Sequence, residues 1–120
     1  MTVHWLGAGL SSVPGIQAVA QSGVSLVVWN RTLAKAQEAI VGFEKYKVEA
    51  LPYTNEALAK SLNPGDVVVS MLPATFHPEI AAICLQHRTH LVTTSYISPA
   101  MKEFDGKARD LKLSFINEAG

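Results

Sequence analysis

The stretch 3-VHWLGAGLSSVPG-15 decides the fold class, because it joins an apolar run to a Gly-x-Gly turn. Gly7 and Gly9 directly follow a predicted strand over residues 3–6, and a helix is predicted over residues 14–21. This order of strand, glycine turn and helix is typical of the phosphate-binding loop of a dinucleotide-binding unit. The third glycine of that pattern is expected at position 12, where Ser12 stands instead. Ser12 is small and a candidate helix cap, so the substitution departs from the pattern but is still compatible with a phosphate-binding loop.

The rest of the chain alternates short apolar runs with longer segments of helical period. Strands are predicted over residues 3–6, 25–29, 47–51, 67–72, 90–94 and 113–117. Helices are predicted over residues 14–21, 33–43, 55–62, 75–87 and 98–111, with Thr32 capping the second and Thr54 or Asn55 the third. This alternation predicts a single α/β domain over residues 1–120 with a Rossmann fold. We expect a doubly wound, six-stranded parallel sheet, ordered 3-2-1-4-5-6, with helices on both faces.

Composition limits the kinds of protein this chain can be. Ten Lys and Arg balance ten Asp and Glu, so no basic excess favours nucleic acid or a membrane surface. Cys84 is the single cysteine, which excludes an internal disulfide, and we expect it in the core. The N-terminus lacks the pattern of a signal peptide, so the cytoplasm is the expected compartment. A hydrophobic share of 48% fits a buried sheet, with an apolar face for another domain or a second copy of the chain.

Three residues after the second predicted strand bear on the choice of nucleotide. An NAD site usually has Asp or Glu here to hold the ribose 2′-hydroxyl, whereas this chain has Asn30, Arg31 and Thr32. Asn30 does not repel a 2′-phosphate, and Arg31 can pair with one through charge-assisted hydrogen bonds. The pattern therefore favours NADP(H) over NAD(H). The alternative is that Arg31 is a solvated charge at a strand end.

The remaining candidates follow from the place where such sheets bind ligands, beyond the carboxyl ends of the strands at the topological switch point. The backbone amides of Leu10, Ser11 and Ser12 are expected to donate to phosphate oxygens. The loop after the fourth strand, with Met71, Leu72 and Pro73, is expected to wall the nicotinamide. His77 is interpreted as a capping or surface histidine, and no histidine spacing indicates a metal site. Further candidates at the ends of the fifth and sixth strands are Thr94, Ser95, Tyr96 and Glu118.

Four stretches resemble the amino-terminal half of saccharopine dehydrogenase, most closely its NADP-dependent, glutamate-forming type. They are GAGLSSVPG, VVWNRTLAKAQ, DVVVSMLPATFHPEIAAICLQHRTHLVTTSYISPAM and SFINEAG, and the resemblance covers nearly the whole chain. It implies that the pyrophosphate is held by Gly7, Gly9, Leu10 and Ser11, and the adenosine ribose phosphate by Asn30, Arg31 and Thr32. It further implies that the nicotinamide is lined by Met71, Leu72, Pro73, Thr94, Ser95 and Tyr96, with Ser95 and Ser98 near the substrate.

The resemblance also implies an activity for the longer protein. The family reaction belongs to lysine metabolism and passes a hydride between the nicotinamide and an imine carbon. Family members continue into a Leu-Asp-Pro-Gly segment and a large substrate and dimerisation domain, whereas this chain ends at Gly120. We therefore expect a cofactor domain that binds nucleotide but turns over little alone, because groups that bind the amino-acid substrate lie in the missing domain. Catalytic residues stay unassigned.

The sequence leaves three alternative functions open. The first is a stand-alone nucleotide-sensing domain whose cofactor drives assembly without redox turnover. The second is an S-adenosylmethionine methyltransferase, although Asn30 and Arg31 stand where that class has an acid. The third is a structural domain with no ligand, since a fold alone does not imply function.

Overall fold

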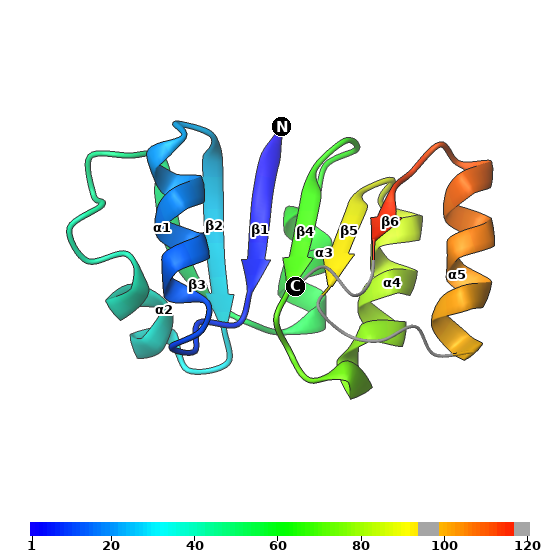
Figure 1. Cartoon of the computed structure of the whole chain (residues 1–120), viewed down its shortest axis with the longest axis horizontal. Coiled ribbons are helices and arrows are strands. Elements are labelled where there is room, and N and C mark those ends of the chain that lie inside the picture. The colour runs from blue at the N-terminus through cyan, green and yellow to red at the C-terminus, as the bar shows by residue number, and fades with distance from the viewer. Residues whose placement is uncertain (94–98, 117–120) are drawn as a thin grey trace.

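One parallel sheet of six strands forms the centre of the protein (Figure 1). The computed structural model describes residues 1–93 and 99–116. The strands are β1 (Thr2–Leu6), β2 (Ser25–Asn30), β3 (Val48–Pro52), β4 (Val67–Ser70), β5 (His90–Thr93) and β6 (Phe115–Ile116). Their order is β3-β2-β1-β4-β5-β6, which confirms the predicted Rossmann arrangement. Because every pair is parallel, the carboxyl ends of β1, β2 and β4 meet at one edge of the sheet.

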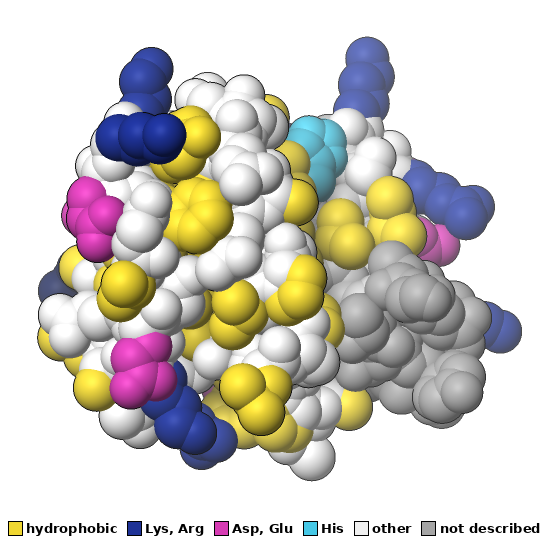
Figure 2. Space-filling view, turned by 60° about the vertical axis from the view of Figure 1, so that its left-hand side comes forward, with side chains coloured by type: hydrophobic (Ala, Val, Ile, Leu, Met, Phe, Trp, Pro, Cys, Tyr) yellow, Lys and Arg dark blue, Asp and Glu magenta, His cyan; other side chains and the backbone are white. Residues whose placement is uncertain are grey.

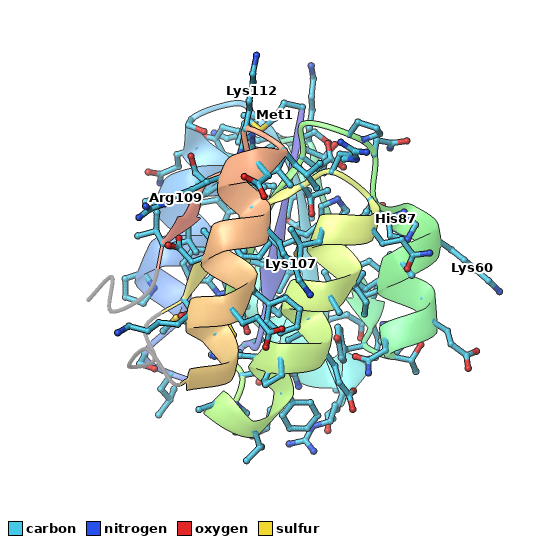
Figure 3. All side chains as sticks on the ribbon, turned by 90° about the vertical axis from the view of Figure 1, so that its right-hand side faces the viewer. Met1, Lys60, His87, Lys107, Arg109 and Lys112 are labelled. Carbon is cyan, nitrogen blue, oxygen red and sulfur yellow. The ribbon has the colours of Figure 1, made fainter. Side chains whose placement is uncertain are left out.

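Helices cover both faces of this sheet, and each face has its own hydrophobic core. One face carries α1 (Val13–Gln21) and α2 (Leu33–Ala39), and the other carries α3 (Asn55–Ser61), α4 (His77–Gln86) and α5 (Pro99–Asp110). Figure 3 shows the second set of helices standing side by side. Figure 2 shows the side bearing α1 and α2, where charged side chains of both signs are present and neither forms a continuous patch. No helix in the described residues is long and apolar enough to cross a membrane.

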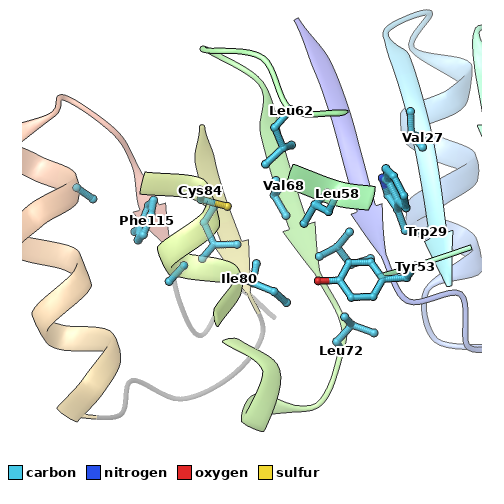
Figure 4. Close-up of a cluster of buried hydrophobic side chains, with 14 of the residues drawn as sticks. Val27, Trp29, Tyr53, Leu58, Leu62, Val68, Leu72, Ile80, Cys84 and Phe115 are labelled. Carbon is cyan, nitrogen blue, oxygen red and sulfur yellow. The ribbon is translucent and has the colours of Figure 1, made fainter. Parts of the chain in front are cut away.

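The core beneath α3, α4 and α5 is made of side chains aimed at the middle of the sheet (Figure 4). Leu58 and Ile80 come from the helices and Val68 from β4, and all three are fully buried in this core. Cys84 lies in this core as predicted, and burial raises the pKa of its thiol to about 11. At this pKa the thiol stays protonated near neutral pH, so Cys84 acts as a small apolar side chain.

Several helices and strands begin or end at other residues than predicted, because turns interrupt them. The helix predicted over 33–43 ends at Ala39, because Gly42 adopts a φ of +87° and turns the chain. The helix predicted over 75–87 is divided into a 3₁₀ turn, η1 (Ala74–Phe76), followed by α4. Pro78 lies in the first turn of α4, where its missing amide costs nothing. The strand predicted over 67–72 ends at Ser70, so its last two residues belong to the loop.

The predicted helix caps are only partly correct. The Thr54 hydroxyl accepts a hydrogen bond of 3.0 Å from the Ala57 amide and caps α3 as predicted. Ser12 and Thr32 occupy the N-cap positions of α1 and α2, but neither side chain makes a capping hydrogen bond. Ser12 has helical backbone angles and is 2% exposed, so its side chain faces the interior instead.

Close packing of α1 on the sheet depends on Gly15 rather than on position 12. A Cβ atom added at Gly15 would lie 2.5 Å from the Trp5 Cη2 atom, closer than van der Waals contact allows. Trp5 lies on β1, and its indole fills the space directly beneath α1. The role that the third glycine of the fingerprint usually plays has therefore moved one helical turn along the chain.

We expect Gly15→Ala to destabilise the protein by about 1–2 kcal/mol, because overpacking outweighs the gain in helix propensity. Gly106 of α5 is the matched control, since an added Cβ there meets nothing within 4 Å. Gly106→Ala should raise the free energy of unfolding by about 0.5–1 kcal/mol. Urea unfolding of both variants measures the two effects, and equal changes in the two would contradict the contact with Trp5.

A buried chain of hydrogen bonds links β2, β1 and the start of β4. The Trp29 indole N–H donates to His4 Nδ1 at 3.2 Å, so that nitrogen carries no proton. The proton of neutral His4 is therefore on Nε2, which donates to Asp66 Oδ2 at 3.1 Å. The Asp66 carboxylate also accepts hydrogen bonds from the backbone amides of Thr2 and Asn63. His4 and Asp66 are 2% and 3% exposed, so the network is shielded from water.

Burial and hydrogen bonding together set the pKa values of His4 and Asp66, and of the separately buried His77. Burial lowers the pKa of His4 below its ordinary 6.5, although Asp66 opposes the shift. Burial likewise lowers the pKa of His77. For Asp66, burial raises the pKa, but the hydrogen bonds from Thr2, Asn63 and His4 outweigh it and hold the pKa below 3.8.

These directions predict that stability is lost on acidification. Below pH 6.5 the unfolded chain takes up protons on His4 and His77 that the folded chain does not, so the free energy of unfolding falls. Asp66 adds a loss of the same sign below its ordinary pKa of 3.8. Urea unfolding at about pH 7.5 and about pH 5 measures the first loss. A variant with Gln at both histidines should lose less stability over this interval, whatever its starting stability, and an equal loss would contradict the assignment.

Candidate nucleotide-binding site

An open groove lies at the carboxyl edge of the sheet, where the loops after β1, β2 and β4 meet. Its volume is about 410 Å³. Its lining residues come from three segments of the chain and are Gly9, Asn30, Arg31, Thr32, Lys35 and Leu72. Five of these six were predicted as site residues from the sequence. The groove therefore brings together the glycine loop, the end of β2 and the loop after β4, as the switch point of the fold requires.

Asn30 holds two of these segments together. Its side-chain oxygen accepts a hydrogen bond of 3.2 Å from the Ala8 amide in the glycine loop. Its side-chain nitrogen donates to the Thr32 carbonyl oxygen at 3.0 Å. Both ends of the carboxamide are thus engaged within the protein. Asn30 positions the glycine loop and the turn that carries Arg31.

The glycine loop lies against the loop after β4 on one side and is open on the other. Gly7 has a φ of +101°, and a Cβ there would lie 3.3 Å from the Met71 carbonyl carbon. Gly9 has nothing within 4 Å of an added Cβ, so the space above it belongs to the groove. Leu10 is 95% exposed at the tip of the loop, beside exposed Ser11.

The backbone donors of this loop differ in part from the expectation. In the described residues the amides of Leu10 and Ser11 donate to no protein acceptor, so they are free to meet an anion. The Ser12 amide donates to the Gly9 carbonyl oxygen at 2.9 Å, so its predicted role as a phosphate donor is wrong. Ser12 instead closes the turn that leads into α1.

Two cations and no carboxylate line the groove. Arg31 and Lys35 are both exposed, and Lys35 lies in the first turn of α2. The Arg31 guanidinium carbon lies 5.2 Å from the centre of the Phe76 ring. Lys35 was not predicted as a site residue; it lines the groove because α2 begins directly after the end of β2.

The loop after β4 is anchored by a buried pair. The Ser70 hydroxyl lies 3.0 Å from His77 Nε2, and the two residues are 0% and 1% exposed. The interpretation of His77 as a surface or capping histidine is therefore wrong. Between these anchors, Leu72 reaches the groove, Met71 lies behind Gly7 and Pro73 is exposed.

Several candidates lie outside the described residues. They are Thr94, Ser95, Tyr96, Ser98 and Glu118. Within residues 1–93 and 99–116, no three His, Cys, Asp or Glu side chains are grouped to hold a metal ion. The described part of the site is thus the half built from the glycine loop, the end of β2 and the loop after β4.

The fold, the glycine loop and the cationic groove together define a dinucleotide-binding domain of the Rossmann class. Residues 3–116 match the family described as saccharopine dehydrogenase NADP binding domain. The chain belongs to this family.

Individual relatives agree with this assignment. The chain is 33% identical over 120 residues to saccharopine dehydrogenase [NADP(+), L-glutamate-forming] of Pyricularia oryzae, and 37% identical over 117 residues to that of Saccharomyces cerevisiae. These alignments cover 99% and 96% of this chain but 27% and 26% of the two relatives. The solved apo structure of the Saccharomyces cerevisiae enzyme superposes with a TM-score of 0.85 at 35% identity, over 99% of this chain and 27% of that one. The chain therefore spans about a quarter of the length of these relatives.

Gly9→Val tests whether the groove is the binding site. Because an added Cβ meets no protein atom, the variant should keep its unfolding midpoint in urea. Its side chain would occupy the space above the loop, so we expect the affinity for NADPH and for NADH to fall at least about tenfold. Titration calorimetry measures this loss, with Gly106→Ala as a control that leaves the groove untouched. Unchanged affinity in a folded Gly9→Val protein would place the nucleotide elsewhere.

Proposed function

We propose that this chain binds NADP(H) in the groove at the carboxyl edge of its sheet, as the cofactor domain of an NADP-dependent oxidoreductase. The observation that carries the proposal is that two cations, Arg31 and Lys35, line the groove beside the open space over Gly9. No carboxylate is among the lining residues. A 2′-phosphate needs positive charge at this position, whereas a ribose 2′-hydroxyl is usually held by an acid. The residues present thus fit NADP(H) better than NAD(H).

Each segment of the groove has a separate task in this proposal. Arg31 and Lys35 bind the 2′-phosphate, with the Thr32 hydroxyl as a further donor. The free amides of Leu10 and Ser11, next to Gly9, bind the pyrophosphate near the start of α1. Asn30 orients both segments through its side chain, and one Nδ2–H and one Oδ1 lone pair stay available for the ribose phosphate.

The nicotinamide half is proposed on less direct grounds. We assign its walls to Met71, Leu72 and Pro73, because their loop is anchored at both ends by Ser70 and His77. The family resemblance adds Thr94, Ser95 and Tyr96 to these walls and places Ser95 and Ser98 near the substrate. The cofactor supplies a hydride at the nicotinamide ring, and the protein's task is to orient it.

The reaction and partners of the whole protein are also proposals. The names of the relatives support an NADP-dependent dehydrogenase of saccharopine, and the family resemblance supports a secondary amine or imine as the reacting group, in lysine metabolism. The relatives are about four times as long as this chain, which supports a further substrate-binding domain as its first partner. We also propose a cytoplasmic location and association with a second copy through that domain.

The competing readings predict different groove chemistry. A methyltransferase usually has an acidic residue at the end of β2 to bind the ribose hydroxyls. Here that position is Asn30, whose side-chain oxygen and nitrogen both make hydrogen bonds within the protein. A nucleotide-sensing domain would change its oligomeric state on binding without redox turnover in the full-length protein. Sedimentation with and without NADPH would separate that reading from an enzyme domain.

Calorimetric titration of the purified chain with NADPH and with NADH tests the proposal directly. We expect NADPH to bind about ten- to a hundredfold more tightly, as charge-assisted hydrogen bonds to one phosphate provide. Arg31→Asp should abolish or invert this preference, because a carboxylate repels the 2′-phosphate and accepts from the 2′-hydroxyl.

Lys60→Asp is the matched control for the charge change. Lys60 is exposed on α3 and points away from the sheet (Figure 3). Its substitution alters the net charge as much as Arg31→Asp does, but far from the groove, so the preference should persist. Equal affinity of the unaltered chain for the two cofactors would overturn the proposal.

A further inference from the structure

The Arg31 side chain is held by an aromatic ring from a distant part of the sequence. Its guanidinium carbon lies 5.2 Å from the centre of the Phe76 ring, in the geometry of a cation–π contact. In the described residues Arg31 makes no ion pair and no side-chain hydrogen bond. Among the described residues, the Phe76 ring is therefore the aromatic partner that restrains the exposed Arg31 guanidinium.

A ring contact of this kind leaves the hydrogen-bonding capacity of Arg31 intact. The five N–H donors of a guanidinium lie in its plane, whereas an aromatic ring attracts the cation through the ring face. A phosphate that approaches the guanidinium can then accept two parallel hydrogen bonds. Because a long, exposed arginine loses side-chain freedom when it binds, a contact that restrains it beforehand reduces the cost of binding.

Phe76 is itself fixed by a backbone hydrogen bond and by packing against the core. It closes η1, where its amide donates to the Pro73 carbonyl oxygen at 3.0 Å, and its half-buried ring packs against the core under α4. The next residue, His77, is buried and paired with Ser70 at the end of β4. The ring thus stands on an anchored segment rather than on a free loop.

The contact also spans the switch point of the sheet. Arg31 follows β2 and Phe76 follows β4, and these strands flank β1 on its two sides. The same β4 loop lines the groove through Leu72. Phe76 therefore connects the end of the groove that carries the cations to the loop assigned to the nicotinamide half.

We propose that Phe76 is a positioning residue for cofactor selection, which holds the Arg31 guanidinium ready for the 2′-phosphate of NADP(H). This inference rests on the proposed function, because it presumes that the groove binds NADP(H). Phe76 acts on NADPH through Arg31 and does nothing for NADH, which has no 2′-phosphate. It thereby contributes to the preference without contacting the cofactor.

Titrations of Phe76→Leu and Phe76→Tyr with NADPH and NADH test this role. Leucine keeps the apolar packing but loses the ring face, so Phe76→Leu should weaken NADPH binding about two- to fivefold and leave the NADH affinity unchanged. Phe76→Tyr keeps the ring face and should retain the affinity of the unaltered protein. Equal weakening of both cofactors by Phe76→Leu would indicate a merely structural role and overturn the proposal.

A double-mutant cycle with Arg31→Gln separates the inference from the proposed function. If Phe76 acts through Arg31, Phe76→Leu should have no further effect on NADPH affinity in the Arg31→Gln background. A protein that prefers NADPH, loses that preference with Arg31→Gln and keeps it undiminished with Phe76→Leu would refute the inference alone. A protein without any preference for NADPH would refute the proposed function and, with it, the inference.

A measurement without cofactor gives a second test. NMR relaxation of the Arg31 Nε–Hε group should show an ordered side chain in the unaltered protein and in Phe76→Tyr. The same group should be more mobile in Phe76→Leu. Equal mobility in all three proteins would contradict the restraint, even if Phe76→Leu proved too unstable for titration.

Discussion

The carboxamide of Asn30 is the interaction on which the groove depends. It joins the Ala8 amide of the glycine loop to the Thr32 carbonyl oxygen beyond β2, so two loops share one rigid link. The parallel ladder between β1 and β2 brings these loops to the same edge, where the Gly7 amide donates to the Trp29 carbonyl oxygen at 2.8 Å, and the Asn30 side chain ties the loops beyond it. An aspartate here could accept from Ala8 but could not donate to Thr32. Asparagine therefore avoids charge repulsion with a 2′-phosphate and also makes both hydrogen bonds that hold the two loops.

The position of α1 illustrates how a fingerprint can change while its geometry survives. The pattern asks for a glycine at position 12, where helix and strand usually approach most closely. Here the bulky Trp5 indole on β1 moves the closest approach to Gly15, and Ser12 is left to close the turn. The loop keeps its open side over Gly9. The physical requirement is a missing Cβ wherever helix and sheet are closest, and the sequence position follows from the side chain beneath.

Much of the fold could be predicted because its signals are local. Alternating apolar runs and helical segments predict a parallel sheet, and the glycine loop identifies its first strand, so the strand order followed. The site was predictable where it coincides with strand ends, as at Gly9, Arg31 and Leu72. Lys35, the buried His77 and the ring over Arg31 were not predicted, because each depends on which loops meet in space. Hydrogen bonding and burial of a polar residue such as His77 are tertiary facts that its neighbours in sequence do not reveal.

The buried network of Trp29, His4 and Asp66 lies on the strands below the groove, and its members are all nearly inaccessible to water. The residues that would choose the cofactor, Arg31 and Lys35, are exposed and share no hydrogen bond with that network. In evolutionary terms, the two sets can vary independently. A descendant of this domain could exchange its surface cations and adopt another nucleotide while inheriting the same interior unchanged.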